Sequence, residues 1–314
     1  TRSQGDFDHS MTLSALDKMD IAWWIKTSPT AYKSLIPPPI DHIICTDASL
    51  VGFGYYLQGT EMRGGGRWSP QEATLHINCL EIKAIKLSIL ALFPGGKHLQ
   101  LKVFSDSMVA IQCINKQGST KSLPCNAATR NLLLFCEEND IHLAMAHIPG
   151  VQNKIADEKS RVFKNPDTEW QLTHHMYAKV CNTLQFFPQI DMFAERLNAK
   201  CPDYCSWELD PFAKHIDAFT VDWNMYQFIY AFPCFSLIGR VMHKFLQSQT
   251  TTKMLLIFPI WRTQSWWTLV TNHIIQQPVI FPVNQLTINL AHKPDQKHPM
   301  QQRLVLMGAV LSTD

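Results

Sequence analysis

The sequence predicts an α/β protein with two layered units. At 314 residues the chain is long enough for two cores of ordinary domain size. Hydrophobic residues make up 46% of the chain and charged residues 17%, which is typical of a folded protein and excludes an intrinsically disordered one. Apolar stretches with a period of two residues alternate with stretches whose period is close to four. We therefore expect strands and helices to alternate along the chain.

The first segment, residues 1–40, has one helical pattern. Apolar residues recur at helical spacing over 16–25, and the run Pro37-Pro38-Pro39 cannot continue a helix. A connecting helix followed by a stiff linker is expected here. The chain starts at Thr1 without a methionine, so we expect it to be a piece of a longer protein.

Residues 41–163 form the first predicted domain. Asn78, followed three residues later by Glu81, is the expected N-cap of its first helix, and the three glycines at 64–66 weaken its third strand. The expected elements are strands at 42–49, 52–58 and 61–68, a helix at 76–91, a strand at 99–105, helices at 107–115 and 125–138, a strand at 141–146 and a helix from 153. This order defines a mixed α/β unit.

Residues 164–314 form the second predicted domain, after a linker at 164–167. Short apolar strands are expected at 189–193, 228–232 and 254–260, with helices at 236–246 and 265–274. Strands that alternate with helices indicate a doubly wound, Rossmann-like α/β layer. No element is assigned after Pro278, where the pattern becomes irregular.

Four acids stand at matching places in the first predicted domain. Asp47 and Asp106 each end a strand, while Glu81 and Asp157 lie in the opening turns of helices. If the two strands are neighbours, these carboxylates share one edge of the sheet. Four carboxylates at one place repel each other unless a divalent cation lies between them, and Mg²⁺ prefers such hard oxygen ligands. Two ions about 4 Å apart are suited to phosphodiester hydrolysis.

Each acid taken alone also has a purely structural interpretation. Asp47 is explained as a turn residue, Glu81 as part of a capping box with Asn78, Asp106 as a helix N-cap and Asp157 as a solvated acid. The joint occurrence with His147 favours the catalytic interpretation. This histidine stands ten residues before Asp157 on a glycine-containing loop, where it can act as a proton donor.

Charge and cysteine content narrow the functional classes further. The formal net charge is +2 and no segment has a strong basic excess, which excludes a stand-alone nucleic-acid binder held by charge. Nine scattered cysteines indicate reduced thiols in an intracellular compartment, nuclear or cytoplasmic. Cys201, Cys205 and His215 suggest a zinc site but lack a fourth ligand, so free thiols are expected. No apolar stretch is long enough for a membrane span.

The motifs of residues 41–163 resemble, in order and spacing, the ribonuclease H domain of retroelement reverse transcriptases. The matching stretches are Thr46-Asp47-Ala48-Ser49, Leu80-Glu81-Ile82-Lys83-Ala84, Ser105-Asp106-Ser107 and His147-Ile148-Pro149-Gly150 through Asn153 to Asp157. The resemblance implies a ribonuclease H-like mixed five-stranded sheet with flanking helices. It also implies two-metal hydrolysis of the RNA strand of an RNA/DNA hybrid, leaving 5′-phosphate and 3′-hydroxyl ends.

The same resemblance assigns roles to single residues. Asp47, Glu81, Asp106 and Asp157 fall on the metal-binding catalytic acids, with two Mg²⁺ ions, replaceable by Mn²⁺, as cofactors. His147 falls on the catalytic loop histidine. Contacts with the substrate are expected from Ser49, Asn78 and Asn153.

The chain is more closely similar to the polyprotein of DIRS-like, tyrosine-recombinase retrotransposons. The stretches that carry this likeness are 76–81, 114–118 and 190–194. Residues 1–40, with the pair Trp23-Trp24, resemble the tail of the preceding polymerase, which is therefore an expected partner beside the RNA/DNA hybrid. The paired aspartates of a polymerase are not found in this sequence. Glu158-Lys159 departs from the family pattern, because relatives carry an apolar and a small residue there.

The second predicted domain resembles a phage-type adenine N6-methyltransferase over 190–201, 231–235 and 255–267. Asp191 is the candidate cofactor-binding residue, with a helix cap as the alternative. Phe232 stands where that family has a polar residue, and Cys234 where it has its second proline. Phenylalanine cannot accept a hydrogen bond from the amine of a flipped base, so neither methyl transfer nor a need for S-adenosylmethionine is expected.

Three hypotheses follow from the sequence. The first is a Mg²⁺-dependent ribonuclease H, part of a retrotransposon polyprotein and followed by a silent methyltransferase-like domain. The second is a catalytically inactive scaffold or nucleic-acid-binding module of retroelement origin. The third is a DNA adenine N6-methyltransferase, which Phe232 disfavours.

Overall fold

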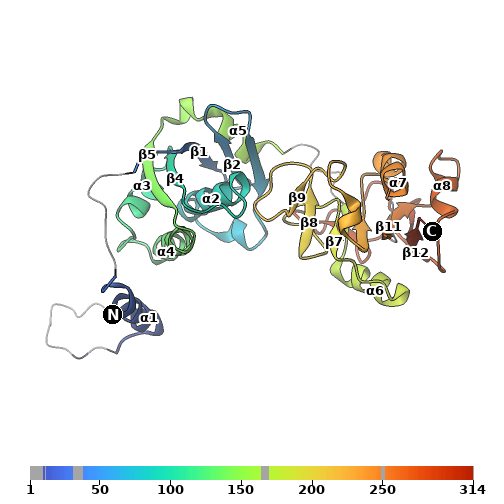
Figure 1. Ribbon diagram of the computed structural model, residues 1–314, viewed down its shortest axis with the longest axis horizontal. Coiled ribbons are helices and arrows are strands. Elements are labelled where there is room, and N and C mark those ends of the chain that lie inside the picture. Colours follow the sequence, from blue (N-terminus) through green and yellow to red (C-terminus); the bar gives the residue numbers. More distant parts are fainter. Residues whose placement is uncertain (1–9, 11, 31–37, 164–169, 249–251, 314) are drawn as a thin grey trace. The chain divides into compact units, whose positions relative to one another are not determined.

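A computed structural model describes residues 10, 12–30, 38–163, 170–248 and 252–313 and has a mixed α/β architecture (Figure 1). The chain forms two compact units, Thr1–Pro39 and Ile40–Asp314. The first contains α1 (Ala15–Thr27), whose N-cap Ser14 exchanges hydrogen bonds with Asp17, and the expected helix at 16–25 is confirmed. The start of the proline run at 37 and the predicted linker at 164–167 lie outside the described residues.

A five-stranded mixed sheet forms the centre of the region 40–163. Its strands lie in the order β3-β2-β1-β4-β5, with β1 antiparallel to β2 and parallel to β4. Because β1 and β4 are parallel neighbours, their carboxyl ends meet at one edge, as predicted for Asp47 and Asp106. All five expected strands are present, as β1 (His42–Ala48), β2 (Gly52–Leu57), β3 (Arg63–Arg67), β4 (Gln100–Ser105) and β5 (His142–His147).

Four helices flank this sheet: α2 (Ile77–Leu92), α3 (Met108–Asn115), α4 (Leu123–Glu138) and α5 (Lys154–Arg161). Apolar residues of α2, α3 and α4 bury a core that includes Leu80 and Ala84 of α2 together with Phe53 and Tyr55 of β2.

The predicted capping box of α2 is wrong. His76 is the N-cap, and its Nδ1 accepts a hydrogen bond from the backbone N–H of Asn78. A ring nitrogen supplies here the acceptor that an asparagine or aspartate side chain would supply. Glu81 therefore lies in the second turn, where its carboxylate is not needed as a cap.

Glycines let α5 lie directly on the sheet. A side chain at Gly54 would bring a Cβ within 2.1 Å of the backbone oxygen of Ala156, and one at Gly65 within 2.5 Å of that of Lys159. Gly54 is also the strand partner of Asp47. The close packing of α5 on β2 thus occurs beside Asp47.

Replacing Gly54 with alanine should lower the free energy of unfolding by about 1–3 kcal/mol, because α5 must move away from its backbone contact. Chemical denaturation measures this change. Gly239→Ala in α7 is the control, since its Cβ would lie 4.0 Å from Trp266, and alanine is favoured over glycine in a helix. Equal stability of the two variants would show that α5 does not depend on a glycine at position 54.

A seven-stranded sheet forms most of the region 170–313, in the order β12-β14-β11-β10-β7-β8-β9. The strands follow chain order outward from β7 to β9 on one side and from β10 to β11 on the other. Beyond β11, β14 lies between β11 and β12 and is antiparallel to both. The strands are β7 (Ile190–Asp191), β8 (Asp203–Ser206), β9 (His215–Ile216), β10 (Phe228–Ala231), β11 (Lys253–Pro259), β12 (Val279–Pro282) and β14 (Val305–Ser312).

The remaining elements in the described part of this region are three α-helices, two short 3-10 helices (Trp223–Met225 and Phe235–Leu237) and a small sheet. The helices are α6 (His174–Leu184), α7 (Ile238–Leu246) and α8 (Trp267–Thr271), and β6 (Trp170–Leu172) pairs with β13 (Ile288–Leu290). The strands at 189–193, 228–232 and 254–260 and the helices at 236–246 and 265–274 were expected. Four earlier elements, β6, α6, β8 and β9, were not expected, and neither were the elements after Pro278. Strands β12 and β14 are held by pairing with each other and with β11, which local periodicity does not reveal.

Arg196 links the two regions of the second compact unit. Its guanidinium donates hydrogen bonds of 2.9 and 2.8 Å to the two carboxylate oxygens of Glu72 and one of 2.6 Å to the backbone oxygen of Arg67. Lys83 lies 2.7 Å from the same carboxylate. Burial by itself raises the pKa of Glu72, but the hydrogen bonds and charge of Arg196 and Lys83 outweigh it and bring the pKa to about 2. Glu72 is therefore ionised and paired. A boundary between two domains at residue 163 stays a prediction.

Eight of the nine cysteines are buried as free thiols. Cys201 contacts the Tyr177 hydroxyl and the backbone oxygen of Pro188, and His215 contacts the hydroxyl of Tyr226. These side chains thus have partners other than a metal. Within the described residues, no helix has both the length and the apolar character that crossing a membrane requires.

Candidate active site

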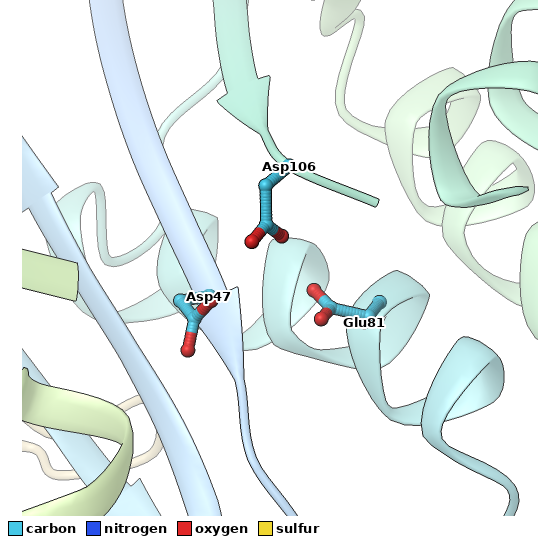
Figure 2. Close-up of side chains that lie close together, drawn as sticks. All are labelled: Asp47, Glu81 and Asp106. Carbon is cyan, nitrogen blue, oxygen red and sulfur yellow. The ribbon is translucent and has the colours of Figure 1, made fainter. Parts of the chain in front are cut away.

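Three of the four predicted acids converge. Asp47 is the last residue but one of β1, Asp106 follows β4 and Glu81 lies on α2. One oxygen from each lies within 4.8 Å of the other two. Figure 2 shows the three carboxylates gathered around one space. The parallel pairing of β1 with β4 sets the first two acids at one sheet edge, and the opening turns of α2 bring the third to it.

Burial and mutual repulsion shape the electrostatics of these acids. Asp47 is 4% exposed and Glu81 6%. Burial raises the pKa of Asp47 to about 6; a hydrogen bond from Ser160 lowers it, and the charges of Asp106 and Asp157 raise it. Burial and then the charges of Asp47 and Asp106 raise the pKa of Glu81 to about 9. Two acids are thus held in a place that disfavours their charge.

The residues present fit a divalent cation. The Oε2 atom of Glu81 is buried and has no hydrogen-bond partner, although it is a strong acceptor. Carboxylate oxygens are the ligands that Mg²⁺ prefers, and a cation would satisfy this oxygen and offset the repulsion. Among the described residues, Asp47, Glu81 and Asp106 are the group of ligating side chains close enough to hold an ion.

The structural interpretations of two acids are excluded. The N-cap of α3 is Ser107, whose Oγ accepts a hydrogen bond from the backbone N–H of Ala110, so Asp106 is not the cap. Glu81 has no capping role, because α2 is capped by His76. Neither carboxylate is therefore needed to cap a helix, and both are available to bind a cation.

Asp157, the fourth predicted acid, lies outside the group of three. Its Oδ1 accepts a 2.6 Å hydrogen bond from Nε of Arg161, one turn later on α5, and its side chain is 44% exposed. It is still close enough for its charge to raise the pKa of Asp47. The neighbouring Glu158 is exposed.

His147 ends β5 and is exposed, paired in the ladder with Ser105. The loop that follows it passes close to the acids: a Cβ on Gly150 would lie 3.1 Å from Oδ2 of Asp106. The loop histidine and Asp106 thus belong to the same sheet edge, because β4 and β5 are parallel neighbours.

Of the three predicted substrate contacts, two are buried. The Nδ2 of Asn153 donates a 2.9 Å hydrogen bond to the backbone oxygen of Thr46, and the hydroxyl of Ser49 contacts the backbone oxygen of Ser160 at 2.7 Å. Asn78 is partly exposed at the start of α2. These contacts connect α5 to β1, and a role in substrate binding stays a prediction.

Sequence reasoning missed Ser160. This serine is fully buried on α5, and its Oγ donates a 2.7 Å hydrogen bond to Oδ2 of Asp47. One signal was present in the sequence: Ser160 follows Asp157 by three residues, and residues at that spacing share a face of a helix.

The candidate cofactor residue of the second predicted domain is also buried. Asp191 is 2% exposed at the end of β7, and its carboxylate accepts hydrogen bonds from the backbone N–H groups of Phe193 and Lys200. Burial raises its pKa to about 6. Phe232 follows β10 and packs against the core, and Cys234 beyond it is exposed. A cofactor role for Asp191 stays a prediction.

The pKa values of Asp47 and Glu81 predict a pH-dependent stability. Between their unfolded values, near 4, and their folded values of about 6 and about 9, the native state binds more protons than the unfolded state. Without a divalent ion, the melting temperature should therefore fall as the pH rises from about 5 to about 9. Stabilisation by Mg²⁺ should grow over the same range, because the ion replaces these protons.

Thermal unfolding in chelator and in Mg²⁺ measures this effect. Glu81→Gln is the control, since it should flatten the pH dependence in chelator. Glu72 does not interfere, because its pKa of about 2 lies below this range. An unchanged slope in Glu81→Gln would assign the pH dependence to other groups.

Comparisons with known proteins give only distant likenesses. No protein-family model matches the chain, and no curated protein is detectably similar to it. Ribonuclease H1 from the archaeon Halobacterium salinarum is 18% identical over 38% of this chain and 96% of its own, with a TM-score of 0.30. LC11-RNase H1, solved with an RNA/DNA hybrid, is 20% identical over 38% of this chain and 92% of its own, with a TM-score of 0.33.

A viral protein gives a further match of this kind. The prototype foamy virus protease-reverse transcriptase is 16% identical over 55% of this chain and 24% of its own, with a TM-score of 0.25. All three TM-scores lie below 0.5, so the residues of the site, rather than these likenesses, carry the functional conclusion.

Proposed function

We propose that this chain is a divalent-metal-dependent ribonuclease H that hydrolyses the RNA strand of RNA/DNA hybrids within a retrotransposon reverse transcriptase polyprotein. The observation that carries the proposal is the convergence of Asp47, Glu81 and Asp106, one oxygen of each within 4.8 Å of the others, together with the buried Oε2 of Glu81, which has no hydrogen-bond partner. The sequence motifs, which resemble those of retroelement ribonucleases H, select this reaction among those that carboxylate-bound metals support.

The three acids would hold Mg²⁺, or Mn²⁺ in its place, through their oxygens. A bound ion supplies two effects, a lower pKa for a water nucleophile and charge neutralisation on the phosphodiester. His147, exposed at the end of β5, would donate a proton to the departing 3′ oxygen. Ser49, Asn78 and Asn153 would help to hold the hybrid or the elements that bind it.

A second ion would require Asp157. The Arg161 guanidinium competes for this carboxylate, so Asp157 would have to exchange an ion pair for a metal contact. Both side chains are about half exposed, and such pairs contribute at most about 1 kcal/mol. The ion pair is therefore a weak obstacle to binding a second ion.

A catalytically inactive module that binds nucleic acid is the second candidate function. The ion pair between Arg161 and Asp157 is the observation that favours it. If Arg161 keeps Asp157 away from the acids, at most one ion is bound and cleavage is lost, while the fold and any hybrid contact persist. The preceding polymerase would then carry the enzymatic role in the polyprotein.

We further propose that residues 164–314 form a Rossmann-like, methyltransferase-like domain without methyl transfer. The strand order, which runs outward from β7 and from β10, supports the doubly wound arrangement. Phe232 and Cys234 follow β10 at the position where that family holds the base, and Phe232 offers no acceptor for an amine. Absence of S-adenosylmethionine binding by calorimetry is the expected result.

Cleavage of a hybrid with a labelled RNA strand tests the nuclease. In Mg²⁺ the protein should cut RNA only when it is paired with DNA, leaving 5′-phosphate and 3′-hydroxyl ends, and should spare single-stranded RNA and duplex DNA. Asp47→Asn and Asp157→Asn are compared in parallel. Loss of cleavage in Asp47→Asn alone indicates that Asp157 is dispensable. If neither the wild type nor either variant cleaves the hybrid at high enzyme concentration, the inactive binding module is favoured.

A further inference from the structure

Ser160 is a buried hydroxyl in contact with one of the three acids. Its Oγ lies 2.7 Å from Oδ2 of Asp47 and 2.8 Å from the backbone oxygen of Asp157. A hydroxyl has one proton to donate. The carboxylate is the stronger acceptor because its oxygen is charged, so the proton is directed to Asp47.

A network of hydrogen bonds holds Ser160 in place. Ser49, in the turn between β1 and β2, has its Oγ 2.7 Å from the backbone oxygen of Ser160, and this Oγ accepts from the backbone N–H of Gly52 at 3.1 Å. Trp68 Nε1 donates a 2.8 Å hydrogen bond to the backbone oxygen of Ser49. Ser160, Ser49 and Trp68 are all at most 5% exposed. The hydroxyl therefore approaches Asp47 from a rigid position.

We propose that Ser160 is a positioning residue for the metal centre. Its hydrogen bond occupies Oδ2 of Asp47 and fixes the carboxylate, which would leave Oδ1 available to bind a metal ion. The inference rests on the proposed function in that it assigns a role within the same site. Groups that hydrogen-bond to metal ligands typically change metal affinity or activity by about 10–100-fold when they are removed.

A second buried serine offers a matched comparison. Ser88 on α2 is also fully buried, but its Oγ donates a 2.7 Å hydrogen bond to the backbone oxygen of Ala84 in its own helix. Replacing either serine with alanine removes the same atom from a buried site. Of the two serines, Ser160 contacts Asp47 and Ser88 contacts no acid of the site. The two variants therefore separate a role at the metal centre from a general packing role.

Calorimetric titration with MgCl₂, without nucleic acid, tests the proposal on the full chain. Ser160→Ala should bind Mg²⁺ about 10–100-fold more weakly than wild type, and Ser88→Ala should bind it as wild type does. Ser160→Cys guards against misfolding, because a thiol is similar in size but a weak donor, and it should show the same direction of change. Thermal unfolding in chelator reports whether each variant is folded.

The outcomes separate this proposal from the nuclease itself. Wild-type affinity in folded Ser160→Ala or Ser160→Cys overturns the positioning role, whether or not the protein cuts hybrids. Equal losses in Ser160→Ala and Ser88→Ala overturn it as well, because the effect is then general. Weaker binding in the Ser160 variants alone supports it, even where no cleavage is found and the nuclease fails. No Mg²⁺ binding by wild type overturns both.

Discussion

Replacing Asp47 with asparagine is expected to lower the rate of hybrid cleavage by about three orders of magnitude, equivalent to about 4 kcal/mol of transition-state stabilisation. The amide removes one charge from the three acids but keeps an oxygen that can accept the hydrogen bond from Ser160. The loss should therefore come from metal binding and not from the fold. Single-turnover cleavage and calorimetric Mg²⁺ binding measure the two effects.

The stability of the same variant provides a check. Because burial and neighbouring acids disfavour the charged form of Asp47, Asp47→Asn should unfold at a temperature no lower than wild type at neutral pH in chelator. Glu137→Gln, an exposed acid on α4, is the activity control and should cleave at the wild-type rate. Unimpaired cleavage by Asp47→Asn would remove the basis of the proposed nuclease.

Replacing Arg196 with methionine is expected to lower the free energy of unfolding by about 3 kcal/mol, because a buried carboxylate loses its main partner. The Glu72 side chain is 11% exposed and would keep only Lys83 and the backbone N–H of Ser69 as partners. The deficit should be present above about pH 4.5 and should shrink as the pH falls toward 2, where Glu72 becomes protonated. Urea denaturation at neutral and acidic pH measures both features.

Two comparisons isolate the contribution of the Glu72–Arg196 pair. Lys214→Met breaks an ion pair with Asp203 in which both side chains are nearly half exposed, and it should lower the stability far less than Arg196→Met does. The double variant Glu72→Gln with Arg196→Met should recover part of the stability, since no buried charge is left without its partner. If Arg196→Met and Lys214→Met are equally mild, the link between the two regions is not a source of stability.

The strands of the five-stranded sheet could be predicted from the sequence because each has a recognisable local pattern of apolar residues. An apolar run that ends in one carboxylate marked β1, and a second run rich in aromatic and apolar residues marked β2. Asp47 and Asp106 lie at the carboxyl ends of β1 and β4, which are parallel neighbours. The N-cap of α2 could not be predicted in the same way. A histidine fills a role for which Asn78 was the better candidate by composition, and only the backbone geometry at His76 decides between them.

The contact between Arg196 and Glu72 could not be predicted from the sequence. Arg196 and Glu72 are 124 positions apart, and nothing in the local sequence of either predicts the other. Strands β12 and β14 were missed for the same reason, because their stability comes from pairing with β11 and with each other. Local patterns encode which segments can form strands, whereas the partners depend on the packing of the whole region.

The sequence by itself determined the order of elements around the first sheet and the places of its four acids, because both follow from local periodicity and spacing. Only the tertiary structure decided which acids converge: Asp47, Glu81 and Asp106 do, while Asp157 pairs with Arg161. Only the tertiary structure also shows that Ser160 donates a hydrogen bond to Asp47. The physical reason is that side-chain distances depend on how closely α5 packs on the sheet, and glycines on two other strands set that approach.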